Sequence, residues 1–119
     1  MFRIKRLFKS FRYALNGFIK TFREEQNLQI QSIMALVVLL SAWYFRLERL
    51  EWALLIFAIG LVMFAELVNS AVERVADVLK PRIDIYVKVI KDVTAAAVML
   101  ASFIAAIIGL IVFWPHIFN

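Results

Sequence analysis

Residues 52–72 read WALLIFAIGLVMFAELVNSAV, a stretch that is apolar for fourteen positions and then carries Glu66 and Asn69. A helix needs roughly 20 predominantly apolar residues to cross a bilayer, and this stretch supplies them. Two further apolar runs flank it: residues 30–45, which Leu28 extends, and residues 93–114, which Pro115 closes. We therefore predict an all-α integral membrane protein with transmembrane helices over about 28–45, 52–73 and 92–114.

The overall composition supports lipid as the surroundings of these helices. Hydrophobic residues make up 64% of the 119 residues, whereas a soluble domain carries about 45–50%. A single domain of this length cannot bury such an excess in its own core. The sequence has no cysteine, which excludes disulfides and thiolate metal sites, and its one histidine, His116, argues against zinc.

Residues 2–22 are predicted to form an amphipathic helix. Its apolar side chains recur three and four residues apart and so share one face: Ile4, Leu7, Phe8, Phe11, Leu15, Phe18 and Phe22. Basic residues occupy much of the rest, which favours a helix lying in the membrane surface. A helix packed on other protein is the alternative.

Charge gives the chain an orientation. The net charge is +5, and basic residues crowd the N-terminal segment and residues 74–92, whereas the C-terminal tail has no Lys or Arg. By the positive-inside rule we expect a multi-pass protein of the inner (cytoplasmic) membrane, with its N-terminus in the cytoplasm and its C-terminus outside. The basic patch can also suit nucleic acid. In so apolar a chain, anionic lipid headgroups fit better, and no nucleic-acid partner is expected.

Polar side chains descend one face of the second predicted span. At about 100° per residue, Glu66, Glu73 and Asp77 fall within roughly 40° of one another, with Asn69 and Ser70 on either side. Glu66 is the anomaly, because an ionisable group at such depth costs at least about 2.5–3.5 kcal/mol on insertion scales. Pairing with basic groups and joining of helices are the structural alternatives for Glu73, Asp77 and Asn69.

Carboxylates on one helical face suit two kinds of chemistry. They can bind Mg²⁺, which prefers oxygen ligands, or one of them can serve as a general base. Glu24 and Glu25 precede the first span, and Lys91 and Asp92 open the third, all at the same predicted boundary. Carboxylates, a lysine and a deep base form a set suited to phosphoryl transfer. The sequence has no glycine-rich phosphate-binding loop, so a nucleotide site must be built from side chains.

The pattern Glu66-x-x-Asn69-Ser70-Ala71-x-Glu73-x-x-x-Asp77, followed by Lys91-Asp92, resembles the signature of the small prokaryotic integral-membrane lipid kinases. These form the diacylglycerol kinase and undecaprenol kinase family. The similarity covers nearly the whole chain. It includes an N-terminal helix with Arg6, Tyr13 and Gly17, and Glu25-x-Asn27-Leu28 at the start of the first span.

This resemblance implies a homotrimer with active sites shared between subunits, using ATP, Mg²⁺ and a lipid alcohol. It implies that Glu66 is the general base, with Asn69 ordering the site, and that Glu25 and Glu73 bind magnesium. Further family roles fall on the nucleotide-binding positions Arg6, Tyr13, Lys91 and Asp92, and on the lipid-binding positions Asn27, Leu28 and Trp52. Where relatives often have Glu-x-His this chain has Arg82-Ile83-Asp84, and Asp84 is the expected substitute contact to the nucleotide.

The sequence leaves an alternative for the lipid substrate and alternatives for the class of activity. The segments Lys9-Ser10-Phe11-Arg12-Tyr13-Ala14 and Glu25-x-Asn27-Leu28 are more similar to the undecaprenol branch, with diacylglycerol as the alternative substrate. A proton-relay or transport protein would also place a carboxylate inside the membrane. A membrane-assembly protein would use the polar face only to join helices, as it would the small-residue face at Ala97, Ala101, Ala105 and Gly109.

Overall fold

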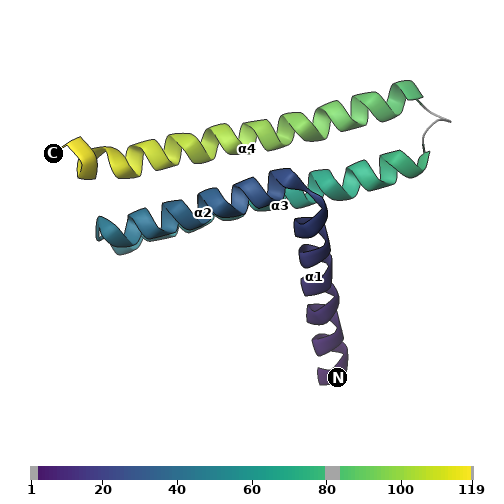
Figure 1. Cartoon of the computed structure of the whole chain (residues 1–119), viewed down its shortest axis with the longest axis horizontal. Helices are drawn as coiled ribbons and strands as arrows, with labels where there is room; N and C mark the ends of the chain where they lie inside the picture. Colours follow the sequence, from purple (N-terminus) through teal and green to yellow (C-terminus); the bar gives the residue numbers. More distant parts are fainter. Residues whose placement is uncertain (1–2, 80–83, 119) are drawn as a thin grey trace.

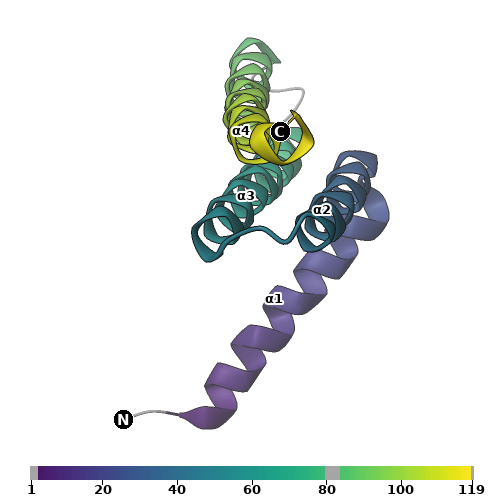
Figure 2. The ribbon, with the colours of Figure 1, turned by 90° about the vertical axis from the view of Figure 1, so that its left-hand side faces the viewer.

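The computed structural model describes residues 3–79 and 84–118, and these residues form four helices joined by short connections. They are α1 (Ile4–Glu24), α2 (Gln26–Tyr44), α3 (Arg49–Leu79) and α4 (Asp84–Phe118). Helices α2, α3 and α4 run side by side, and α1 leaves them at a steep angle (Figure 1). Viewed along the bundle, α3 lies between α2 and α4 (Figure 2).

Three of the helices, α2, α3 and α4, are long and apolar enough to cross a membrane. The predicted all-α class, with three such helices after an N-terminal helix, is therefore confirmed. Most of their large apolar side chains are exposed on the single chain. This is the arrangement expected when lipid or a neighbouring subunit, rather than the chain's own core, covers the helices.

The helices extend beyond the predicted spans. Helix α3 continues through the charged residues that follow Val72 and ends at Leu79, and α4 begins at Asp84, eight residues before its predicted span. Pro115 was expected to close the third apolar run, but α4 continues past it to Phe118. A proline so near a C-terminus removes only one hydrogen bond of the last turns, so the helix can absorb it.

Helix α1 carries its apolar stripe on an open face. It has no buried residue, and Ile4, Phe8 and Phe11 are each about two-thirds exposed. The pattern that predicted an amphipathic helix over 2–22 thus produces a helix whose apolar face is largely exposed, with only Phe18 of the stripe half-buried. A membrane surface remains its predicted partner.

A sharp corner at Glu25 joins α1 to α2. Glu25 is extended (φ −118°, ψ 119°) and both ends α1 and caps α2. The Glu25 backbone N–H donates to the carbonyl of Thr21 (2.9 Å), and the Gln29 side-chain amide donates to that of Phe22 (2.8 Å). These bonds satisfy carbonyls at the end of α1. The corner directs the Glu25 side chain toward α3.

A Schellman motif closes α2 at the other end of the bundle. The backbone N–H of Leu47 donates to Ala42 (3.2 Å), that of Arg46 donates to Trp43 (3.3 Å), and Arg46 has the left-handed φ of 55°. Leu47 and Ala42 are both buried, in a cluster with Leu55 and Val112. This cluster is where α2, α3 and α4 are packed together.

The small-residue face of α4 is only partly used within the chain. Ala101 is buried, but Ala97 is exposed, and a Cβ added to Gly109 would meet nothing within 4 Å. Close helix approach is therefore limited to the middle of this face.

Candidate active site

Three side chains of α3 are buried although they are polar: Glu66, Asn69 and Ser70. Glu66 is only 2% exposed, and it lies a little past the middle of the 31-residue helix α3. Turning about 100° per residue places these side chains and Glu73 on the side of α3 that faces α2 and the Glu25 corner. The sequence pattern thus brings a deep carboxylate and its polar neighbours together.

Residues from α2 and from the corner surround the Glu66 carboxylate. The side-chain amides of Asn27 and Gln31 lie within hydrogen-bonding reach of it, and the carboxylates of Glu25 and Glu73 are close enough to repel it. Leu28, which is fully buried, packs α2 in place beside them. Glu66 therefore sits among amide groups and like charges, without a basic partner among the described residues.

Hydrogen bonds hold the two neighbouring carboxylates. The Ser70 hydroxyl donates to Glu25, across 45 residues of sequence. The Asn69 side-chain amide donates to Glu73 at 3.3 Å. In residues 3–79 and 84–118, the Oδ1 of Asn69 is buried and accepts no hydrogen bond. An unsatisfied buried oxygen beside two carboxylates makes this a place rich in oxygen ligands.

Ion pairs frame the cluster on the side toward the α3–α4 connection. Lys91 donates to Asp77 at 2.7 Å, linking α4 to α3, and Arg74 donates to Glu24 at 3.2 Å, linking α3 to the end of α1. Lys91 is also close enough to Glu73 to interact with it electrostatically. Lys91 thus lies beside the carboxylate cluster, and its role near phosphate stays a prediction.

Several predicted site residues lie elsewhere in the chain. Asp92 pairs with Lys88 at 3.5 Å on the exposed side of α4. Tyr13 and Arg6 are exposed on α1, about 18 and 28 Å before Glu25 at 1.5 Å per helical residue. Trp52 lies fourteen residues before Glu66, about 21 Å away along α3, and packs against the buried cluster at the far end. A single chain does not bring these four residues to Glu66.

Most of the segment expected to contact the nucleotide base lies outside the described residues. Arg82 and Ile83 lie outside the described residues, and Asp84 is described only as the first residue of α4. Conversely, sequence reasoning missed Gln31. The signal was present, because Gln31 follows Asn27 by four residues and so lies on the same helical face.

The oxygen-rich cluster has carboxylates for a metal ion but not a complete set of ligands. In the described ranges, no three Asp, Glu or His side chains are grouped closely enough to hold a metal ion by themselves. Magnesium is usually held by one or two carboxylates, with substrate phosphates and water completing its shell. Glu25 and Glu73, with the unsatisfied Asn69 oxygen nearby, fit such a site that substrate completes.

Fold and site together define a multi-pass membrane protein whose spanning helices hold a cluster of carboxylates near one end. Comparison with known proteins narrows this class. The family model described as prokaryotic diacylglycerol kinase matches residues 12–113. The chain belongs to this family of membrane lipid kinases, and the resemblance seen in the sequence is confirmed.

The chain is similar to relatives named after two different lipid substrates, undecaprenol and diacylglycerol. It is 34% identical over 114 residues to an undecaprenol kinase of Bacillus subtilis, a match that covers 96% of this chain and 93% of that protein. It is 36% identical over 104 residues to a diacylglycerol kinase of Synechocystis, covering 87% and 59%. It is 34% identical over 115 residues to a diacylglycerol kinase of Helicobacter pylori, covering 97% and 83%. The chain is therefore a lipid phosphotransferase of the membrane.

Proposed function

We propose that this chain transfers the γ-phosphoryl group of ATP to undecaprenol, giving undecaprenyl phosphate. The observation that carries the proposal is the Glu66 carboxylate, buried in a spanning helix without a basic partner among the described residues and ringed by polar groups of α2 and α3. The Bacillus relative supports undecaprenol as the acceptor. Diacylglycerol is the second candidate, supported by the Synechocystis and Helicobacter relatives.

Glu66 serves as the general base. It accepts the proton of the lipid hydroxyl while the alcohol oxygen attacks the γ-phosphorus, and the bond from that phosphorus to the ADP oxygen breaks. The amides of Asn27 and Gln31 hold the carboxylate for this task. Asn69 orders the site through Glu73. Most of the catalysis comes from placement of the two substrates and from electrostatics.

Glu25 and Glu73 hold the magnesium that accompanies ATP. When bound, Mg²⁺ supplies positive charge against the phosphate oxygens. Ser70 fixes Glu25 and Asn69 fixes Glu73 by hydrogen bonds, so each carboxylate is oriented before substrate arrives. Glu73 comes near Glu66 because it follows Glu66 by two turns of α3, and Glu25 comes near because the corner between α1 and α2 turns its side chain toward α3.

The nucleotide lies against Lys91 and Asp92, with Lys91 toward the phosphates and Asp84 in the adjoining segment. Lys91 already reaches the carboxylate cluster through Asp77. Arg6 and Tyr13 border the nucleotide from α1. Because α1 leads away from the cluster of its own chain, these two residues would be supplied between neighbouring subunits.

A homotrimer suits this sharing of sites, and one face of α3 supports it. Apolar residues alternate three and four positions apart along α3, the spacing of a helix–helix seam. All but the half-buried Leu61 are exposed on the single chain: Leu54, Phe57, Leu61, Phe64, Val68, Ala71, Val75 and Val78. Three copies packed through this stripe would cover it, with the N-terminus of each in the cytoplasm and the C-terminus outside.

A direct assay tests the proposed function. Purified protein in mixed micelles is supplied with γ-labelled ATP and either undecaprenol or diacylglycerol, with and without Mg²⁺. We expect label in undecaprenyl phosphate, dependent on Mg²⁺ and formed faster than phosphatidic acid. Faster labelling of diacylglycerol would reverse the choice of lipid, and no labelled lipid at all would refute the proposed activity.

A further inference from the structure

Two side chains of α3 hold the corner between α1 and α2. The Ser70 hydroxyl donates to the Glu25 carboxylate, and one turn further along α3 the Arg74 guanidinium donates to the Glu24 carboxylate at 3.2 Å. Ser70 and Arg74 are four residues apart and so lie one above the other on the same face of α3. We call these two contacts the corner clamp. The clamp holds two neighbouring carboxylates, where α1 ends and α2 begins, against consecutive turns of one helix.

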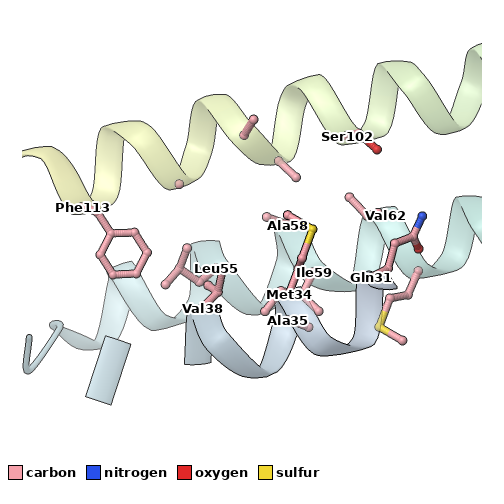
Figure 3. A pocket seen from close by; sticks show the side chains of 14 residues that line it. Gln31, Met34, Ala35, Val38, Leu55, Ala58, Ile59, Val62, Ser102 and Phe113 are labelled. Carbon is pink, nitrogen blue, oxygen red and sulfur yellow. The ribbon is translucent and has the colours of Figure 1, made fainter. Parts of the chain in front are cut away.

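The place of the corner in the bundle depends on α3 rather than on α4. Over the described residues, the backbones of α1 and α2 approach each other and α3, and neither approaches α4. In the half of the bundle near the corner, a groove separates α2 from α4, with Gln31 and Met34 on its α2 side and Ser102 on its α4 side (Figure 3). Contacts with α3 therefore fix where the corner lies.

The corner gathers negative charge, and Arg74 supplies the opposite charge. Glu24 and Glu25 are adjacent carboxylates at the C-terminal end of α1, where the helix dipole disfavours negative charge. In the described ranges, Arg74 is the one basic side chain paired with either of them. The pair is half-exposed, 44% for the Arg74 side chain and 47% for that of Glu24, so it contributes little to overall stability. Its expected effect is on where the two carboxylates point.

We propose that Arg74 is a positioning residue for metal binding: by holding Glu24 it fixes the corner, and the corner directs the Glu25 carboxylate toward the site that it shares with Glu73. This inference rests on the proposed function, because it takes Glu25 and Glu73 as magnesium ligands. It gives Arg74 no contact with substrate. Groups that orient a metal ligand from outside the coordination shell commonly change metal affinity by about 10–100-fold.

Charge and position predict opposite effects of Arg74 on magnesium. As a charge alone, Arg74 repels a cation bound at Glu25 and Glu73, so its removal should tighten metal binding. As a positioning residue, Arg74 keeps Glu25 in place, so its removal should weaken metal binding. The direction of the change therefore decides between the two roles.

Arg74→Gln tests the proposal, with Arg23→Gln as the matched control. Arg23 directly precedes Glu24 and is exposed, and in the described part of the chain it forms no ion pair. Each variant loses a positive charge near the corner, but only Arg74→Gln loses the clamp. Binding of Mn²⁺, a paramagnetic substitute for Mg²⁺, is measured by electron paramagnetic resonance with an ATP analogue that cannot transfer its phosphate. Amide hydrogen exchange of residues 21–29 reports on the corner without metal or nucleotide.

We expect Arg74→Gln to raise the Kd for Mn²⁺ by about tenfold and to speed hydrogen exchange across residues 21–29. In mixed micelles it should need about tenfold more Mg²⁺ for half-maximal activity, with kcat at saturating Mg²⁺ close to the wild type, because Glu66 and Glu73 are unchanged. Arg23→Gln should match the wild type or bind Mn²⁺ slightly more tightly. Reversal of the pair completes the test: Glu24→Arg should weaken Mn²⁺ binding, and the addition of Arg74→Glu should restore most of the affinity.

Two results would overturn the proposal. In one, Arg74→Gln binds Mn²⁺ as tightly as the wild type or more tightly, which would leave Arg74 as a charge alone. In the other, Mn²⁺ binding weakens but hydrogen exchange is unchanged and reversal of the pair restores nothing, which would assign Arg74 to the nucleotide itself. A wild type that binds Mn²⁺ with the analogue, shows the expected pattern across the variants and labels neither lipid would uphold the positioning role and refute the kinase proposal.

Discussion

The two halves of α3 use glutamate in opposite ways. In the half that ends at Leu79, Glu66 is buried among the amides of Asn27 and Gln31 and beside two more carboxylates. Near the other end Glu51 accepts the backbone N–H of Glu48 (3.0 Å) and contacts Nε2 of His116 with both oxygens (3.0 and 3.2 Å). The Glu51 carboxylate receives its hydrogen bonds at the start of its own helix and from His116 of α4. The Glu66 carboxylate has amide neighbours that stabilise it, but no positive charge among the described residues that would neutralise it.

We infer that this difference separates the proposed general base from a structural carboxylate. Glu51 caps the start of α3 and ties it to the end of α4, beside the packed rings of Phe45 and Phe113 (centroids 6.1 Å apart). Such a group completes its bonds on folding and has little left for a substrate. Glu66 lies where insertion of a charge is costly, and substrate or metal would complete its surroundings. We expect changes at the Glu66 end to affect turnover and changes at the Glu51 end to affect stability.

The largest effect is expected at Glu66. The Glu66→Gln variant should fold and remain in the membrane, because an amide of the same shape replaces a buried acid. Its kcat should fall by about 10²–10⁴-fold, because an amide cannot accept the hydroxyl proton. The measurement is turnover of purified protein with undecaprenol. A Glu66→Gln variant that keeps its activity, with unchanged or higher stability, would instead favour the helix-joining role of Glu66. Ion flux through the wild-type protein in liposomes without ATP would favour a transporter.

Removal of Glu73 should change the magnesium requirement. Glu73→Ala deletes one proposed ligand and the acceptor of the Asn69 amide. We expect half-maximal activity to need about tenfold or more additional Mg²⁺, with part of the rate recovered at saturation. A magnesium titration of initial rates measures this, and Glu48→Ala, in the connection just before α3, provides the control. Identical titrations for Glu73→Ala and the wild type would remove Glu73 from the metal site.

At the structural end, His116→Ala should weaken the fold and spare the chemistry. The lost hydrogen bonds to Glu51 should lower stability by about 1 kcal/mol, because Glu51 keeps its bond to Glu48. Thermal unfolding in detergent gives the stability, and kcat at a temperature well below the midpoint gives the activity. A large loss of kcat in the folded His116→Ala protein would contradict the division of α3 into two ends.

The smallest effect is expected at Arg46, the left-handed residue of the Schellman motif. Glycine adopts this conformation without the Cβ crowding that arginine suffers but loses more backbone freedom on folding, so Arg46→Gly should stabilise the protein by about 0.5 kcal/mol. Unfolding midpoints in the same detergent compare the two proteins. A destabilised Arg46→Gly variant would show that the arginine side chain itself stabilises this end of the bundle.

The sequence predicted the helices better than their ends. Three apolar runs and one amphipathic stripe sufficed for the number and class of the helices, because burial in lipid depends on composition and period. Helix ends depend on local hydrogen bonds that composition does not record. Residues 73–79 stay helical although three of the seven are charged, and Pro115 is tolerated because it lies in the last turns.

The sequence could predict which site residues lie close together on α3, but not the contacts that other helices make with them. Glu66, Asn69 and Glu73 share a face through helical periodicity alone, so their proximity follows from spacing. The bond from Ser70 to Glu25 depends on the corner at Glu25, and the approach of Gln31 to Glu66 depends on how α2 packs against α3. The four predicted residues Arg6, Tyr13, Trp52 and Asp92 depend on family resemblance, and a single chain leaves them apart from Glu66.

The most direct measurement compares Glu66→Gln with Glu51→Gln, two identical changes on one helix, for transfer of labelled phosphate to undecaprenol and for thermal unfolding. We expect opposite results from the two variants: Glu66→Gln abolishes nearly all transfer and unfolds at or above the wild-type midpoint, whereas Glu51→Gln transfers phosphate normally and unfolds at a lower temperature. Near-normal transfer by folded Glu66→Gln would contradict the claim that the buried carboxylate is the base of this kinase.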